Sequence, residues 1–127
     1  MSTKTTLGRV LVVDDEAELM SALVEMLKAQ SYDAVGFTSP QDALAAVAEQ
    51  DFDLLLSDHT MPTMDGIELL RSALAIDHQI VGIIMTGQGT VQTAVEAMKI
   101  GADDYLLKPF KLAAVMPVLA RCMDVRR

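Results

Sequence analysis

Short apolar runs alternate along the chain with longer stretches in which apolar residues recur every three or four positions. The runs have the length of buried strands and lie at residues 9–13, 32–37, 52–58, 79–86 and 104–107. Between them the spacing is that of amphipathic helices, as for Leu19, Leu23 and Leu27 in the first such stretch. The pattern predicts a chain that alternates strand and helix throughout.

Local start and stop signals place the helices. Ser39 and Pro40 form a helix start, because serine caps the first turn and proline fits its first position. Thr90 can cap a later helix, which Gly101 would end. Pro117 removes a backbone donor, so we expect a kink or a late start in the last helix. The first predicted helix ends near residue 30, and the later ones cover about 39–49, 67–75, 90–100 and 111–125.

Strands that alternate with helices need crossover connections, which produce a parallel sheet covered by helices on both faces. The central runs at 10–13 and 54–57 consist mainly of apolar residues, as burial on both faces demands. The sequence therefore predicts a single α/β domain with a doubly wound parallel sheet.

Composition narrows the class of protein. The 127 residues fit one domain, and 51% hydrophobic residues indicate a globular chain. The net charge of -8 argues against a nucleic-acid surface, which needs a basic face. The lone cysteine, Cys122, excludes an internal disulfide and fits a reducing compartment. Because no apolar run has the length of a membrane span or a signal peptide, we expect a cytoplasmic protein that does not contact membranes.

The two ends of the chain are expected to differ from the rest. Residues 1–7 are predicted to be a flexible start. The last residues, MDVRR, read as a helix cut in mid-course, with 126–127 as the start of a linker or a continuing helix. We therefore expect an excerpt from a longer protein, with an output domain possible in the same chain.

Polar residues follow four of the predicted strands. The strands end in Asp14 and Asp15, in Asp58, in Thr86 and in Lys108. These ends share one rim of a doubly wound sheet, where ligands bind. Two carboxylates about 4 Å apart repel by roughly 4 kcal/mol at an effective dielectric near 20, and a hard cation such as Mg²⁺ would remove that repulsion. An aspartate there can act as a nucleophile toward a phosphoryl group, with a hydroxyl and an ammonium to bind its oxygens.

Five short motifs, taken in order, resemble a receiver domain of a two-component response regulator over roughly residues 10–125. They are VDDE at 13–16, D-x-x-M-P at 58–62, MDG at 64–66, MTG at 85–87 and GADDYLLKPF at 101–110. Each motif is weak alone, but each lies at a predicted strand end or in the adjoining loop. The resemblance implies a flavodoxin-like receiver domain at 8–125, with a five-stranded sheet in the order 2-1-3-4-5.

The resemblance also implies roles for the rim residues. Asp58 would be the phosphoacceptor and would take its phosphoryl group from a histidine of a kinase or phosphotransfer domain. Mg²⁺ or Mn²⁺ would be held by Asp14, Asp15, Asp58 and the backbone carbonyl of Thr60, with one carboxylate acting through water.

A switch is implied as well. Thr86 would move toward the phosphoryl group, and Tyr105 would rotate inward, which would change the face formed by 90–100, 104–107 and 111–125. Lys108 would pair with the phosphate, and its bond to Pro109 would be cis. Gln88 occupies a position that tunes phosphoryl lifetime in receivers.

The stretch 85–110 resembles receivers joined to enhancer-binding ATPases or to sensor histidine kinases. The last helix lacks the early arginines of receivers that dimerise through matched salt bridges to bind DNA. This argues against a DNA-binding transcription factor of that subgroup, and the acidic net charge leads us to expect no direct nucleic-acid contact by this domain.

Three other functions share part of the pattern. An aspartyl-phosphate phosphatase would place D-x-D after the first strand, whereas Asp14 and Asp15 are adjacent. An FMN-binding electron carrier would need a phosphate-binding loop there, and the acidic DDEAE repels phosphate. The intact acidic set also disfavours an interaction module that takes up no phosphate. We expect no enzymatic activity beyond the gain and loss of the chain's own phosphoryl group.

Three further residues have plainer interpretations. His59 is predicted to be a partly exposed loop residue, and His78 to lie in a polar turn. Cys122 is predicted either to pack in the interior or to lie on the surface.

Overall fold

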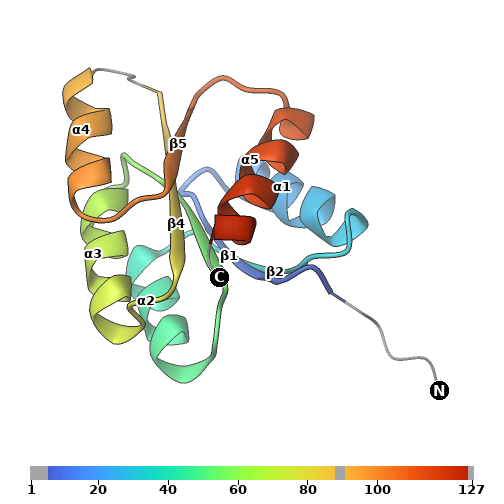
Figure 1. The fold of residues 1–127 in the computed structure, drawn as a ribbon, viewed down its shortest axis with the longest axis horizontal. Coiled ribbons are helices and arrows are strands. Elements are labelled where there is room, and N and C mark those ends of the chain that lie inside the picture. The colour runs from blue at the N-terminus through green and yellow to red at the C-terminus, as the bar shows by residue number, and fades with distance from the viewer. Residues whose placement is uncertain (1–5, 88–90, 126–127) are drawn as a thin grey trace.

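The computed structural model describes residues 6–87 and 91–125, and it confirms the alternation of strand and helix. The strands form one parallel sheet in the order β2-β1-β3-β4-β5 (Figure 1), the order that the family resemblance implied. The strands are β1 (Arg9–Val13), β2 (Asp33–Phe37), β3 (Leu54–Asp58), β4 (Val81–Thr86) and β5 (Asp104–Leu107). The helices are α1 (Ala17–Ala29), α2 (Pro40–Glu49), α3 (Gly66–Ile76), α4 (Val91–Lys99) and α5 (Leu112–Val125).

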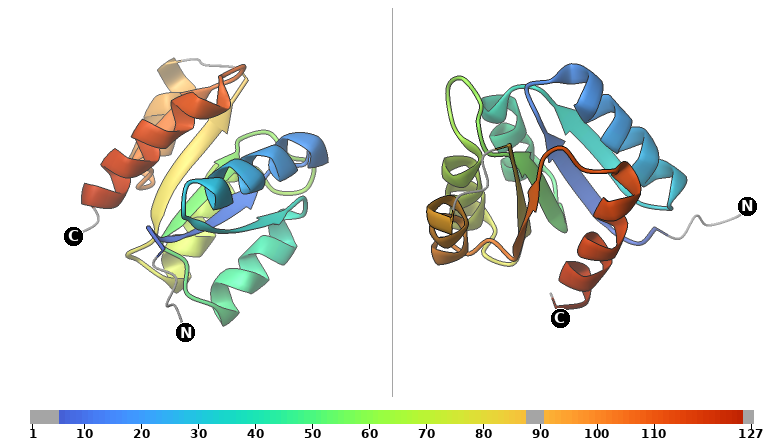
Figure 2. Two further views of the ribbon diagram at one scale, coloured as in Figure 1. Left: turned by 90° about the vertical axis from the view of Figure 1, so that its right-hand side faces the viewer. Right: turned by 90° about the horizontal axis from the view of Figure 1, so that it is seen from above.

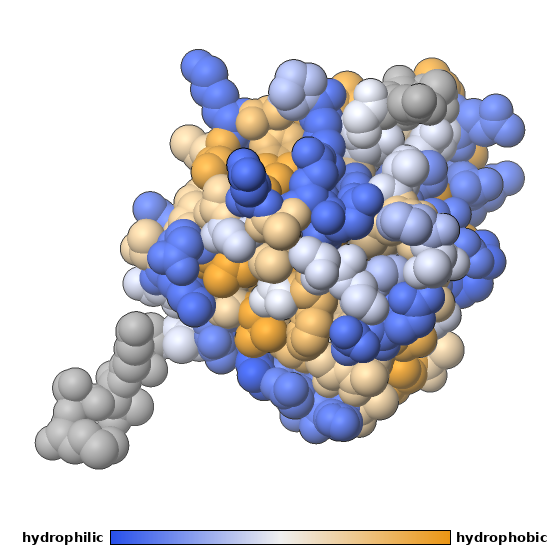
Figure 3. Space-filling model, turned by 180° about the vertical axis from the view of Figure 1, so that it is seen from behind, coloured by the Kyte–Doolittle hydropathy of each residue, from blue (hydrophilic) through white to orange (hydrophobic). Residues whose placement is uncertain are grey.

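Helices cover both faces of the sheet (Figure 2). The face under α2, α3 and α4 receives Leu11, Leu55 and Ile84 from the strands. The face under α1 and α5 receives their sequence neighbours Val12, Leu56 and Ile83. Successive side chains of a strand point to opposite faces, so the continuous apolar runs supply both halves of the core. The exterior is mixed, and Figure 3 shows hydrophilic and hydrophobic residues interspersed over the back of the molecule.

Three strands begin later than predicted: β2 starts one residue late, and β3 and β4 start two residues late, after residues that contact groups outside the sheet. Phe52 is buried under the Arg9 guanidinium, whose central carbon lies 4.8 Å from the ring centroid, and β3 starts only at Leu54. The Gln79 N–H donates to the Asp77 carboxylate at 3.0 Å, and β4 starts only at Val81.

The end of α4 and the course of α5 also bear on the predictions. Gly101 follows α4 with a φ of +109°, a conformation that favours glycine, as a helix end at this position requires. Because α5 already begins at Leu112 and runs through the exposed Pro117, the late start is wrong. Thr90, and most of the ends at 1–7 and 126–127, lie outside the described residues.

Within residues 6–87 and 91–125, no helix combines the length and the hydropathy that crossing a bilayer demands.

The start of α3 lies tightly against the end of β3. A Cβ atom at Gly66 would lie 2.2 Å from the Asp58 carbonyl oxygen, so only glycine allows this approach. The Gly66 N–H donates to the His59 carbonyl at 2.8 Å, and the buried Ser57 hydroxyl donates to the Asp58 carbonyl at 3.0 Å. The glycine of the MDG motif therefore fixes the distance between α3 and the end of β3.

Gly66→Ala is expected to lower the free energy of unfolding by about 1–3 kcal/mol, the usual cost of overpacking, because the added methyl group must displace the Asp58 backbone. Chemical denaturation followed by circular dichroism measures the change. Gly87→Ala is the matched control, since a Cβ there meets nothing within 4 Å, and its change should stay within about 0.5 kcal/mol. Equal stability of the two variants would contradict the close packing of α3.

Candidate functional site

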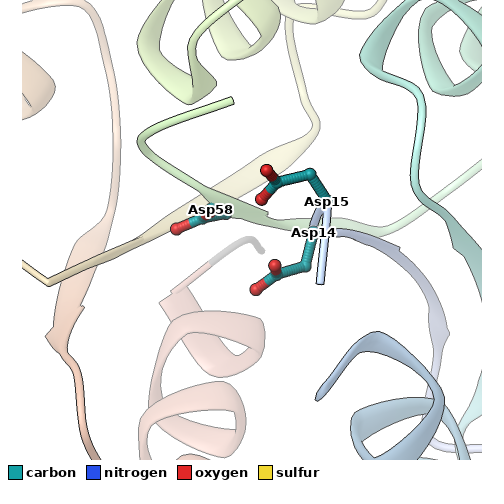
Figure 4. Close-up of side chains that lie close together, drawn as sticks. All are labelled: Asp14, Asp15 and Asp58. Atoms are coloured by element: carbon teal, nitrogen blue, oxygen red, sulfur yellow. The ribbon is translucent and has the colours of Figure 1, made fainter. Parts of the chain in front are cut away.

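Three carboxylates meet where β1 and β3 end. The two strands pair in parallel with Val13 opposite Ser57, so Asp14 and Asp58, which follow these residues, come to the same rim. One carboxylate oxygen from each of Asp14, Asp15 and Asp58 lies within 4.8 Å of the others. Figure 4 shows the three side chains pointing to the same side of the strand ends. The rim therefore concentrates negative charge in a small volume.

Lys108, which directly follows β5, reaches into this cluster. Its Nζ lies 2.9 Å from Oδ2 of Asp14 and 3.0 Å from Oδ1 of Asp58. A third carboxylate, Oε1 of Glu16, lies 3.6 Å away. Asp14 is fully buried and Asp58 is 6% exposed, and buried carboxylates are costly unless they are paired. Lys108 therefore supplies the pairing that allows both side chains to stay in the protein.

The pKa values reflect this crowding. Burial, with the charges of Asp14 and Asp15 adding to it, raises the pKa of Asp58 to about 6 in spite of its hydrogen bond from Lys108. Burial alone would lower the pKa of Lys108, but its hydrogen bonds to Asp14 and Asp58 outweigh that effect and raise it. The ammonium stays charged, and the cluster still carries more negative charge than Lys108 neutralises.

The donor set fits a hard divalent cation. Mg²⁺ prefers oxygen ligands and commonly takes one or two carboxylates. Both oxygens of Asp14 already accept hydrogen bonds, Oδ1 from the Glu16 N–H at 2.9 Å and Oδ2 from Lys108. Asp15 is exposed and Asp58 keeps some exposure, so these two carboxylates are the more accessible ligands. The excess negative charge favours a cation at this place.

Thr86 and Lys108 lie at the same rim, and the remaining predicted residues that the structure describes lie on β5 or in adjoining loops. Thr86 ends β4 and is 1% exposed, and its carbonyl accepts the Lys108 N–H at 2.7 Å. The Lys108–Pro109 bond is cis. Tyr105 lies opposite Ile84 in the sheet and is half-buried. Thr60 lies in the β3–α3 loop two residues after Asp58, and Gln88 lies outside the described residues.

Sequence reasoning missed two contributors to the rim. Glu16 was seen as acidic but given no contact with Lys108. Ser57 was treated as part of an apolar strand, although a hydroxyl in a fully buried strand was a signal that it binds a backbone group. The histidines do not join the cluster: His59 is half-buried in the loop after β3, and His78 is exposed.

Comparison with known proteins agrees with this geometry. Residues 10–120 match the family model of the response regulator receiver domain. The chain is 41% identical over 107 residues to the transcriptional regulatory protein FixJ of Bradyrhizobium diazoefficiens, which covers 84% of this chain and 52% of FixJ. It is 40% identical over 114 residues to the transcriptional regulatory protein ZraR of Escherichia coli, which covers 90% of this chain and 26% of ZraR. The chain thus spans about a quarter to a half of these relatives.

Solved structures of receiver domains have a similar fold. A CheY-like receiver domain protein from Methanospirillum hungatei superposes with a TM-score of 0.90 at 26% identity, covering 95% of this chain and 97% of that one. The beryllofluoride-activated NtrC4 receiver domain superposes with a TM-score of 0.88 at 31% identity, covering 94% and 98%. With the acidic rim and the sheet order 2-1-3-4-5, these matches establish that the chain belongs to the response regulator receiver domain family of two-component signalling.

Proposed function

We propose that Asp58 accepts a phosphoryl group from a phosphohistidine of a partner protein. The observation that carries the proposal is the 3.0 Å contact of Lys108 with Asp58 beside two further carboxylates. Asp14 is fully buried with both oxygens engaged, so it is a poorer nucleophile than Asp58, which retains 6% exposure. Within the described residues, Asp15 is exposed and makes no ion pair with Lys108, which contacts Asp14 and Asp58 instead.

The transfer exchanges one bond for another. An oxygen of the Asp58 carboxylate bonds to phosphorus while the phosphorus–nitrogen bond of the donor breaks, and the electron pair returns to the imidazole nitrogen, which is then protonated. Lys108 is placed to pair with a phosphoryl oxygen as the charge leaves Asp58. Bound Mg²⁺ or Mn²⁺ would neutralise charge on the transferring group. Asp15, Asp58 and the Thr60 carbonyl would hold the cation directly, and Asp14 through water, because its oxygens already accept two hydrogen bonds.

The partner would be a histidine kinase or a phosphotransfer domain. A groove lined by the charged Glu16 and Lys108 also contains Leu19, Gly87, Pro109 and Phe110, and these residues would contribute to the surface that the partner contacts. The acidic chain, with a net charge of -8, supports a domain that itself makes no nucleic-acid contact. We place the domain in the cytoplasm, and an output domain in the same longer protein is consistent with the greater length of its relatives.

Acetyl phosphate with Mg²⁺ is expected to add one labile phosphoryl group to the chain, detected by intact mass. Asp58→Asn should abolish the adduct, whereas Asp51→Asn, at an exposed aspartate before β3, should leave it unchanged. An adduct that survives in Asp58→Asn would refute the assignment of the acceptor. Repeated hydrolysis of unrelated phosphate esters would instead favour a phosphatase.

We further propose that the phosphoryl group changes the face formed by α4, β5 and α5. Thr86 would move toward the new charge, and the half-buried Tyr105 would rotate inward. This face already exposes large apolar side chains: Val91, 82% exposed, with Val95 and Met98 on α4 and Leu107 on β5. A shift from 1:99 to 99:1 needs about 5.5 kcal/mol of differential stabilisation, which the new charge-assisted hydrogen bonds and metal contacts would supply.

Beryllofluoride with Mg²⁺ is expected to shift the amide resonances of α4, β5 and α5 in solution NMR. In Thr86→Ala, resonances around Asp58 should still move while those of the distant face do not, because the hydroxyl that couples them is gone. Thr86→Ser keeps the hydroxyl and should restore the response. Unchanged resonances of α4, β5 and α5 in the wild-type chain would refute the proposed coupling.

A further inference from the structure

Residues 37–41, from the end of β2 to the first turn of α2, contact two parts of the proposed metal site. The Asp14 N–H donates to the carbonyl of Phe37 at 3.2 Å, which fixes the point where β1 ends and the acidic pair begins. Four residues later Gln41, in the first turn of α2, binds Thr63 in the β3–α3 loop. The segment therefore spans from the carboxylates after β1 to the loop that carries Thr60.

The contact between Gln41 and Thr63 uses both ends of the glutamine amide. Its Nε2 donates to the Thr63 hydroxyl oxygen at 2.8 Å, and that hydroxyl lies 3.1 Å from Oε1 and can donate to it. The partners are 22 residues apart in the sequence, so the contact joins two separate loops. Both side chains are exposed, and this pair gives the outer part of the loop a polar attachment to α2.

Gln41 lies in a helix turn that is anchored by a cap and by buried residues. Ser39 caps α2 by accepting the Asp42 N–H at 3.2 Å, and Pro40 and Ala43 are buried beneath the helix start. The amide of Gln41 therefore projects from a helix turn that is held by both a cap and the core.

The loop is fixed at its two ends. The His59 N–H donates to the Met85 carbonyl at 2.7 Å, and Asp65 and Glu68 form a reciprocal capping box at the start of α3. Between these ends Met61 is buried, whereas Thr60 and Thr63 are exposed. Gln41 thus restrains the exposed part of the loop, close in sequence to the carbonyl of Thr60.

We propose that Gln41 and Thr63 are positioning residues for the divalent cation. Their contact holds the β3–α3 loop at a set distance from the segment that also anchors Asp14, so the Thr60 carbonyl and the carboxylates stay in register without the cation. The inference rests on the proposed metal site. Groups that orient metal ligands typically change affinity 10–100-fold when they are removed. Here the effect should be smaller, because an exposed contact acts through three residues of backbone.

The test is Mg²⁺ affinity, measured by NMR titration of the amides of residues 58–66. Gln41→Ala and Thr63→Val should each raise the dissociation constant about three- to tenfold, which corresponds to about 0.6–1.4 kcal/mol. The double variant should be no weaker than either single variant, since both remove the same contact. Thr63→Ser keeps the hydroxyl and should bind Mg²⁺ like the wild type. Gln30→Ala, at an exposed glutamine after α1, is the matched control and should also bind normally.

A second readout separates positioning from general stability. The rate of phosphorylation by acetyl phosphate should be lower in Thr63→Val at subsaturating Mg²⁺ and should return to the wild-type rate at saturation. Chemical unfolding in EDTA measures the stability of each variant without the cation, so that a loss of stability can be told apart from a loss of Mg²⁺ affinity. Wild-type affinity in Gln41→Ala and Thr63→Val, additive losses in the double variant, or a rate deficit that persists at saturation would overturn the inference while the metal site stands. Failure of the wild-type chain to bind Mg²⁺ would overturn the metal site and this inference together.

Discussion

The ion pairs of Lys108 with Asp14 and Asp58 are the interactions on which this site depends. Carboxylates that are buried side by side repel one another and lose the solvation of water, and one ammonium group offsets only part of that cost. Burial, with the neighbouring charges of Asp14 and Asp15 adding to it, accordingly raises the pKa of Asp58 to about 6. The negative charge of the rim is also the basis of its proposed chemistry, in which a cation and a transferred phosphoryl group would both bind beside these carboxylates.

The fold creates the charge cluster by topology. Parallel strands place Asp14, Asp58, Thr86 and Lys108 at one rim although they are spread over most of the chain. Among the residues that the structure describes, the strands supply no polar side chain to the core apart from Ser57 and the residues at their ends, so the sheet is stabilised by apolar burial and the polar groups gather at the rim. Gly66 lets α3 close on the end of β3. The site is thus held by the sheet and by loops that are anchored to it, such as the one between β3 and α3.

Hydrophobic periodicity was enough to predict the alternating elements, since burial on both sheet faces imposes apolar runs and helical spacing. The motifs at the strand ends then predicted which residues share the rim, because parallel strands bring those ends together. Contacts made by loops were not predictable in the same way. Glu16 near Lys108 and Gln41 against Thr63 depend on the paths of loops, and no sequence spacing encodes them. The starts of β3 and β4 were missed for a related reason, because Phe52 and Gln79 are held by Arg9 and Asp77 outside the ladder.

The most direct test is the titration of the Asp58 carboxyl group by carbon-13 NMR, with and without saturating Mg²⁺. Without the cation its pKa should lie near 6, as crowding among buried carboxylates requires. With Mg²⁺ bound, the pKa should fall toward or below the ordinary aspartate range, because a nearby cation favours the charged carboxylate against the burial and the neighbouring carboxylates that raise its pKa. An ordinary pKa in the metal-free chain, or a raised pKa that saturating Mg²⁺ leaves unchanged, would contradict the account.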